Sequence, residues 1–137
     1  MMRLLFVFVF LSGVAFGQFD NEIDFYPNGN KKSEKYEKDN YDFYYSWYEN
    51  GQLECQKISL NNSIIQSIFW FKNGQIRVLT QFGEINKNAK IKTEVVWDGL
   101  RIEWYENGKI RCNKYYKDEE IINENCYDIN GKEISCN

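Results

Sequence analysis

Four cysteines are the residues of this chain best suited to covalent or redox chemistry, namely Cys55, Cys112, Cys126 and Cys136. An even number of cysteines permits disulfides when a chain reaches an oxidising compartment. No C-x-x-C motif is present, which disfavours a redox-active role. The 137 residues include no histidine. This absence argues against serine–histidine triads, Cys–His nucleophiles and nearly all zinc sites.

The spacing of the last three cysteines suggests two competing disulfides. If residues 117–121 form a turn, Cys112 and Cys126 fall opposite each other on neighbouring strands. Around the last Asn-Gly, Cys126 and Cys136 nearly face each other, with a one-residue bulge between them. Cys126 cannot pair with both. The two possibilities of one C-terminal disulfide and of no disulfide therefore both remain open. Cys55 lies several strands away from Cys112, too far for a disulfide.

The carboxylates show no spacing that fixes a catalytic or metal site. Asp118-Glu119-Glu120 is an acidic triple without the alternating pattern of a calcium loop. A hydrolase would need two carboxylates across a cleft, and a solvated turn is the simpler interpretation. We therefore expect no metal, no cofactor and no enzymatic activity.

A short phrase with two aromatic residues and Asn-Gly recurs along the chain, as "WYENGQLEC" at 47–55 and "WYENGKIRC" at 104–112. The steps between successive Asn-Gly dipeptides are 22, 23, 34 and 23 residues. A regular step of this size indicates a repeat architecture. The predicted turns are Asn28-Gly29, Asn50-Gly51, Asn73-Gly74, Asn107-Gly108 and Asn130-Gly131.

Each unit is predicted to be a β-hairpin. Asn-Gly suits both central positions of a two-residue type I′ turn, and the flanks are rich in strand-forming residues. The only proline, Pro27, lies beside the first turn. We therefore expect an all-β meander of serial antiparallel hairpins, about five units of about 23 residues. Helix is expected only in the first 18 residues, which are discussed below as a signal peptide.

This turn type also predicts which side chains meet across each hairpin. It places Trp104 opposite Arg111, Trp70 opposite Arg77, and Trp47 opposite Glu54. Trp over Arg would form a cation–π pair, and stacked hairpins would set the tryptophans about 10 Å apart. Either these tryptophans pack under neighbouring strands, or they form an exposed ribbon that binds sugar rings, peptide or protein. The candidate binding residues are Trp47, Trp70, Trp104, Arg77 and Arg111.

The first 18 residues have the order of a secretory signal peptide. Arg3 precedes an apolar run, and small residues lead to a cleavage site near Gly17. The apolar part is shorter than the roughly 20 residues of a membrane-spanning helix. We predict a signal peptide at 1–18 and one repeat domain at 19–137, with an insertion near 79–97, where the longest step between dipeptides falls.

The phrase "DGLRIEWYENGKIR" at 98–111 resembles the MORN-repeat variant family, whose bacterial members are often labelled YwqK-family antitoxins. The resemblance covers roughly 25–137 and implies serial β-hairpins. The family usually has a second glycine-bearing turn between phrases. At 38–40 and 60–62 that glycine is missing, and asparagine is expected to take the left-handed position.

The expected function is that of an exported, non-enzymatic scaffold in the periplasm, at the cell surface or outside the cell. Its partner would be a protein or a cell-envelope glycan, and the alternative is an antitoxin or immunity protein that neutralises a toxin. A net charge of −3 without a basic patch argues against nucleic acid. Membrane association, which the repeat's name suggests, has little support because anionic lipids attract basic segments.

Overall fold

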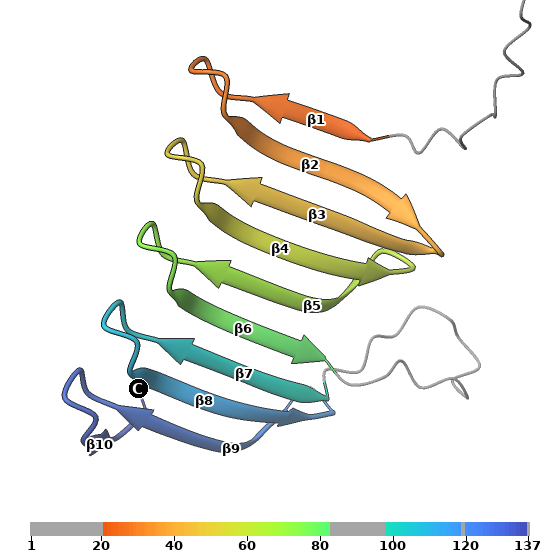
Figure 1. The fold of residues 1–137 in the computed structure, drawn as a ribbon. Helices are drawn as coiled ribbons and strands as arrows, with labels where there is room; N and C mark the ends of the chain where they lie inside the picture. The colour runs from red at the N-terminus through yellow and green to blue at the C-terminus, as the bar shows by residue number, and fades with distance from the viewer. Residues whose placement is uncertain (1–20, 83–97, 119, 137) are drawn as a thin grey trace, which may run out of the picture.

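The computed structural model describes residues 21–82, 98–118 and 120–136, which form one antiparallel sheet of ten strands in chain order (Figure 1). The strands are β1 (Glu22–Phe25), β2 (Lys31–Lys38), β3 (Tyr41–Trp47), β4 (Leu53–Leu60), β5 (Ser63–Trp70), β6 (Ile76–Phe82), β7 (Gly99–Trp104), β8 (Ile110–Lys117), β9 (Glu120–Tyr127) and β10 (Glu133–Ile134). The predicted all-β meander of hairpins is confirmed. The predicted signal peptide at 1–18 lies outside the described residues.

The five Asn-Gly dipeptides lie at turns along one side of the sheet, but the predicted turn type is wrong. In the second unit, the Gly51 amide donates to the Tyr48 carbonyl at 2.8 Å, and the Tyr48 amide donates to the Gln52 carbonyl at 2.8 Å. Gly51 has a φ of 85°, whereas Asn50 is not in the left-handed region. The loop is therefore a type I turn followed by a left-handed glycine, a three-residue connection with a bulge.

The turns on the opposite side of the sheet are the type I′ turns. Asp39 and Asn40 have φ values of 53° and 65°, and Asn61 and Asn62 have values of 51° and 63°. Lys38 pairs with Tyr41, and Leu60 pairs with Ser63, so each of these turns is a two-residue loop. The expectation that asparagine replaces glycine in these turns is confirmed.

The three-residue loop moves the hairpin register by one position. The predicted oppositions of Trp47 with Glu54, Trp70 with Arg77, and Trp104 with Arg111 are therefore wrong. The tryptophans lie opposite aliphatic residues instead, as Trp47 with Leu53, Trp70 with Ile76, and Trp104 with Ile110. Each of these pairs adjoins a bulge, where two residues of one strand oppose one residue of the other.

Side chains alternate between two faces of the sheet, and the register assigns them. We call one the aromatic face, formed by Tyr36, Phe43, Tyr45, Trp47, Ile58, Ile68, Trp70, Leu79, Leu100, Ile102 and Trp104. We call the other the cationic face, which includes Tyr44, Cys55, Lys57, Ser67, Phe69, Val78, Thr80, Arg101, Glu103, Cys112 and Lys114, together with the carboxylates Glu37, Asp42 and Glu124.

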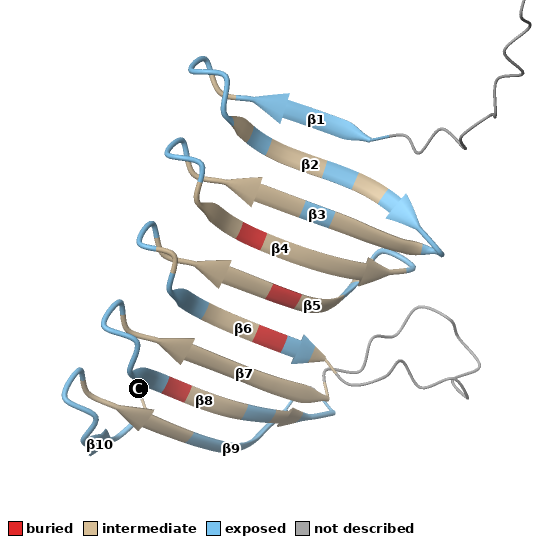
Figure 2. Cartoon of the chain, in the orientation of Figure 1, coloured by how far each residue is buried: buried red, intermediate tan, exposed pale blue. Residues whose placement is uncertain are grey.

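The most buried residues all lie on the cationic face, on the four strands that carry red segments in Figure 2. They are small: Cys55, Ser67, Thr80 and Cys112. No large side chain is fully buried among the described residues. Among the described residues, therefore, no second layer covers either face of the sheet.

The predicted insertion at 79–97 begins inside a regular strand. Residues 79–82 belong to β6, and residues 83–97 lie outside the described residues. Phe82 pairs directly with Gly99, so β6 and β7 are neighbours in the sheet. A side chain at Gly99 would collide with the backbone of Gln81 and Phe82. Glycine is therefore required at the first residue of β7.

Candidate functional site

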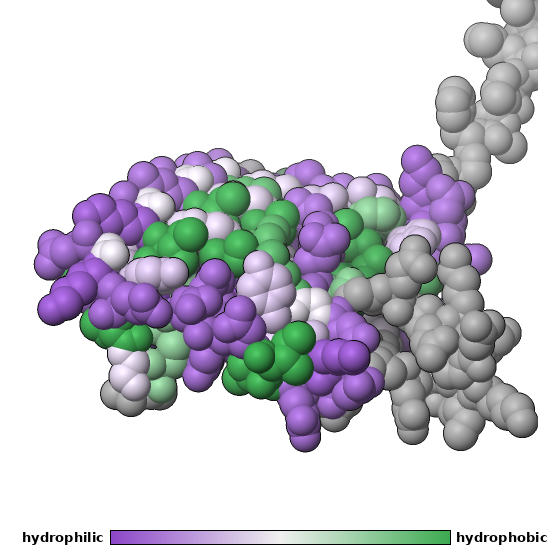
Figure 3. All heavy atoms as spheres, turned by 90° about the horizontal axis from the view of Figure 1, so that it is seen from below, coloured by the Kyte–Doolittle hydropathy of each residue, from purple (hydrophilic) through white to green (hydrophobic). Residues whose placement is uncertain are grey.

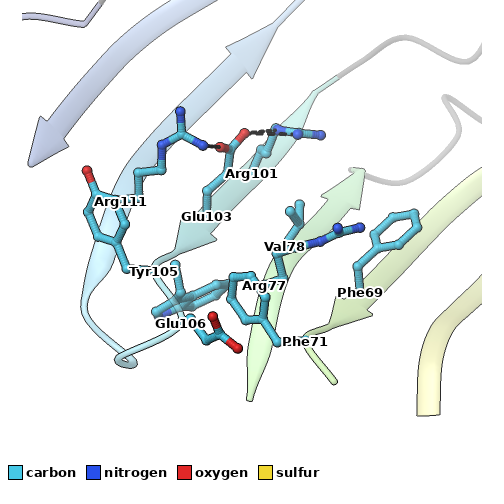
Figure 4. Close-up of a pocket in the computed structure, with 10 residues that line it drawn as sticks. Phe69, Phe71, Arg77, Val78, Arg101, Glu103, Tyr105, Glu106 and Arg111 are labelled. Carbon is cyan, nitrogen blue, oxygen red and sulfur yellow. Dashed lines mark hydrogen bonds and ion pairs between the residues drawn. The ribbon is translucent and has the colours of Figure 1, made fainter. Parts of the chain in front are cut away.

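A hollow of about 640 Å³ lies on the cationic face over β5 to β8 (Figure 4). Its lining residues are Phe69, Phe71, Arg77, Val78, Arg101, Glu103, Trp104, Tyr105, Glu106 and Arg111. A second hollow of about 530 Å³ shares Phe69 and Arg101 with the first and extends to Lys57 and Tyr116. Because they share these two lining residues, we refer to the two hollows together as the cationic groove.

Positive charge predominates in the cationic groove, although the chain has a net charge of −3. Of the residues that the structure describes, four cationic ones and two carboxylates line it. The Arg101 Nη2 lies 2.9 Å from Glu103 Oε1, and the Arg111 Nη1 lies 3.7 Å from Glu103 Oε2. Glu103 therefore holds two guanidinium groups that extend toward it in Figure 4.

Phe69 is an aromatic lining residue of the groove, and two cations lie close to its ring. The Arg77 guanidinium lies 5.6 Å from the centre of the ring, and the Lys57 Nζ lies 5.8 Å from it. Such contacts contribute about 0.5–1 kcal/mol when they are exposed. An aromatic ring flanked by a guanidinium and an ammonium group suits a ligand that carries both carboxylates and apolar groups.

The hairpin bulges bring two of the arginines to this groove. Arg77 and Arg111 each follow the aliphatic residue that pairs with a tryptophan, at the position where the register shifts. Their charged ends reach Phe69 and Glu103, both of which lie on the cationic face. The three-residue loop and its bulge therefore account for two findings. They separate Arg77 and Arg111 from the tryptophans, and they place both arginines in the groove.

The structure separates most of the predicted binding residues. Arg77 and Arg111 line the cationic groove, whereas register assigns Trp47, Trp70 and Trp104 to the aromatic face. Trp104 also borders the groove near the hairpin turn. The predicted cation–π pairs of Trp70 with Arg77 and of Trp104 with Arg111 are not formed, since the arginines contact Phe69 and Glu103 instead.

The tryptophans belong to a half-buried apolar surface. The Trp47 ring stacks on Tyr45 at 6.0 Å, and the Lys31 Nζ lies 5.0 Å from its centre. Apolar residues, drawn in green, are also exposed between purple polar ones in the view from the β9–β10 end of the sheet (Figure 3). Ile76 and Ile110, the partners of Trp70 and Trp104, are 39% and 41% exposed. This surface is a second candidate for contacts.

Phe69, Arg101 and Glu103 are not among the residues that the sequence predicts for the site. Strand alternation could have identified Phe69 and Glu103, provided that residues are counted from the bulge beside each tryptophan and not from a two-residue turn. Phe69 and Glu103 each precede a tryptophan of the repeated phrase and therefore face away from it.

The cysteines occupy two separate places on the cationic face. Cys126 and Cys136 form a disulfide, and the Cys112 Sγ lies 2.6 Å from the Cys126 Sγ. Cys55 lies opposite Phe69 and is buried. Burial raises the pKa of both the Cys55 and the Cys112 thiol.

Three sulfur atoms could in principle hold a soft metal ion, because those of Cys112, Cys126 and Cys136 lie within 4.8 Å of one another. The disulfide leaves only Cys112 as a thiolate donor, so this arrangement does not fit a metal site. Beside it, Lys114 donates to Glu124, and this hydrogen bond raises the pKa of Lys114.

Across the described ranges, no helix has the length and apolar character to cross a bilayer.

One repeat of the chain matches a known family. Residues 97–118, which include the phrase with Trp104, match the sequence model described as the MORN repeat variant. The resemblance noted from the sequence is therefore confirmed at this repeat. Searches of the curated proteins and of the solved structures each found no match.

Proposed function

We propose that this chain, which contains a MORN repeat variant at residues 97–118, is an exported, non-enzymatic scaffold that binds a partner protein through its cationic groove. One observation carries the proposal. Four cationic side chains, Lys57, Arg77, Arg101 and Arg111, line the groove that contains Phe69, on one face of a chain that is acidic as a whole. Such a groove favours an acidic segment with apolar residues between its carboxylates.

Electrostatic attraction alone would not select one partner. Phe69 and Val78 supply apolar contact area at the floor of the groove, and Arg77 and Arg101 supply planar donors at its sides. Guanidinium groups bind carboxylates in a bidentate geometry, which adds directionality. The combination predicts an extended peptide segment as the bound part of the partner.

The leader-like residues 1–18 support export, and the absence of histidine supports a non-enzymatic role. A toxin as the bound partner would make the chain an antitoxin or immunity protein, the alternative function. That case predicts a one-to-one complex, and rescue of cells from the toxin when this chain is expressed.

The test begins with affinity capture from envelope and secreted fractions, using the full chain expressed with its own leader. The dissociation constant of the captured partner is then measured for the wild type and three variants. Arg101→Gln and Lys57→Gln should each weaken binding about tenfold, or about 1.4 kcal/mol. Trp70→Leu, on the aromatic face, should leave the affinity unchanged.

The reverse pattern would overturn the proposal. If Trp70→Leu abolishes binding and Arg101→Gln does not, the aromatic face is the contact surface. A cell-envelope glycan captured in place of a protein would also contradict the proposed partner class, because sugar rings stack on exposed aromatic side chains.

A further inference from the structure

Three cysteines meet where β8, β9 and the C-terminal segment come together. Cys112 and Cys126 lie directly opposite each other in register, and Cys126 is bonded to Cys136. The Cys112 sulfur lies 2.6 Å from that of Cys126. We infer that these cysteines form an intramolecular thiol–disulfide exchange site, in which Cys112 displaces Cys136 and releases the C-terminal strand.

The step needs neither an oxidant nor a reductant. The Cys112 thiol loses its proton, and the resulting thiolate attacks the Cys126 sulfur. A Cys112–Cys126 bond forms while the Cys126–Cys136 bond breaks, and the electron pair leaves on the Cys136 sulfur, which takes up a proton. One disulfide and one thiol are present before and after the step.

The backbone accommodates both disulfides. The Cα atoms of Cys126 and Cys136 are 5.3 Å apart, within the usual range for a disulfide. Directly opposed residues of antiparallel strands, such as Cys112 and Cys126, have Cα atoms about 4.5–5.5 Å apart. Exchange therefore requires movement of side chains and of the short C-terminal segment, and the rest of the sheet can stay in place.

Cys55 serves as an internal comparison. It occupies the same position of the repeated phrase as Cys112, in "WYENGQLEC" against "WYENGKIRC", and it is similarly buried. Its register partner on β5 is Phe69, whereas the partner of Cys112 on β9 is a cysteine. The repeat therefore places a buried thiol twice, and only the second thiol faces a disulfide.

Release of Cys136 has a structural consequence. β10 has two residues, Glu133 and Ile134, and both are exposed. Two register pairs and the hydrogen bonds of the turn at 128–132 hold it beside β9, and beyond them the disulfide is its covalent attachment to that strand. Without that bond, β10 can separate and leave the backbone groups of Tyr127 and Cys126 unpaired, and such an edge can pair with another strand.

Trypsin separates the four cysteines, because Lys or Arg residues fall between them. Cys55 falls in peptide 39–57, Cys112 in 112–114, Cys126 in 118–132 and Cys136 in 133–137. The oxidised full chain is incubated with N-ethylmaleimide and no added thiol, and the non-reduced digest is read by mass spectrometry. We expect labelled 133–137 together with a cross-link between 112–114 and 118–132.

Two variants complete the test. Cys112→Ser should lower labelling of Cys136 by at least about tenfold, since no internal thiol remains to attack. Cys55→Ser should leave that labelling unchanged. The peptide analysis of the wild-type chain tests the exchange even if neither variant folds. If Cys112 carries the label and peptides 118–132 and 133–137 stay joined, or if Cys55→Ser abolishes labelling of Cys136, the exchange site does not exist.

Discussion

The hydroxyl of Tyr48 donates a hydrogen bond of 2.8 Å to the main-chain carbonyl of Trp70, 22 residues further along the chain. The same bond joins Tyr26 to the carbonyl of Trp47 and Tyr105 to that of Tyr127. The second aromatic residue of a phrase therefore ties its own hairpin to the next one. Burial raises the pKa of Tyr48, so this hydroxyl keeps its proton at neutral pH.

Tyr48→Phe removes one of these bonds and leaves the ring in place. The Trp70 carbonyl then loses a donor in a partly buried site, and we expect the free energy of unfolding to fall by about 1 kcal/mol. Urea denaturation of the full chain measures this change. Tyr115→Phe, which alters an exposed tyrosine on β8, is the control and should have no effect. Equal losses in both variants would contradict a specific role for the hydrogen bond.

Phe71→Tyr makes the converse change. Phe71 occupies the same position of the third phrase as Tyr48 does in the second, but it has no hydroxyl. The β6–β7 register would place a new hydroxyl near the Trp104 carbonyl, as Tyr48 lies near that of Trp70. We expect a gain of up to about 1 kcal/mol, read by the same denaturation. A loss of stability would show that the third junction differs from the other junctions.

The meander could be predicted from the sequence because its turns and strand residues repeat along the chain. The turn type could not, since Asn-Gly suits both a two-residue loop and the last two positions of a three-residue loop. Backbone conformation separates the two, and Asn50 is not in the left-handed region. That difference of one residue changes the cross-strand partner of each tryptophan from a charged to an aliphatic residue. For the same reason the groove that contains Phe69 could not be predicted.

The predicted arginines lie in the groove for a reason that differs from the predicted one. Arg77 and Arg111 were expected to cover tryptophans, and instead they contact Phe69 and Glu103. Arg101 lies outside the repeated phrase at 104–112, because it precedes Trp104 by three residues, so the repeat gave no reason to select it. Its role becomes visible only when β6, β7 and β8 are placed side by side.

Gly51→Ala tests the left-handed position of the hairpin turn. Gly51 has a φ of 85°, and no atom lies within 4 Å of an added Cβ. Any cost therefore comes from backbone conformation, and we expect about 1–2 kcal/mol for alanine. Gly51→Asn should cost less, because asparagine adopts this conformation at Asn40 and Asn62 in the same chain. Thermal unfolding compares the variants, and an equal cost for both would contradict the explanation.

Gly99→Ala tests a lack of space instead. The added Cβ would collide with the Gln81 carbonyl and the Phe82 backbone, and no side-chain movement can relieve that contact. We expect a loss of about 1–3 kcal/mol, with faster amide hydrogen exchange concentrated in β6 and β7. Uniform exchange across all strands, or no change in either measurement, would contradict the proposed close approach of the two strands.

Glu103→Gln separates the binding role of the groove from its contribution to stability. Glu103 pairs with Arg101 and Arg111 in partly exposed ion pairs, and such pairs contribute about 0–1 kcal/mol. Stability should therefore change little. Loss of the carboxylate raises the positive charge of the groove, so an acidic partner should associate faster, with a steeper dependence on salt. Surface plasmon resonance at several salt concentrations measures both properties. Glu124→Gln, whose ion pair with Lys114 lies outside the groove, is the matched control. If both variants accelerate association equally, net charge explains the effect and the cationic groove does not.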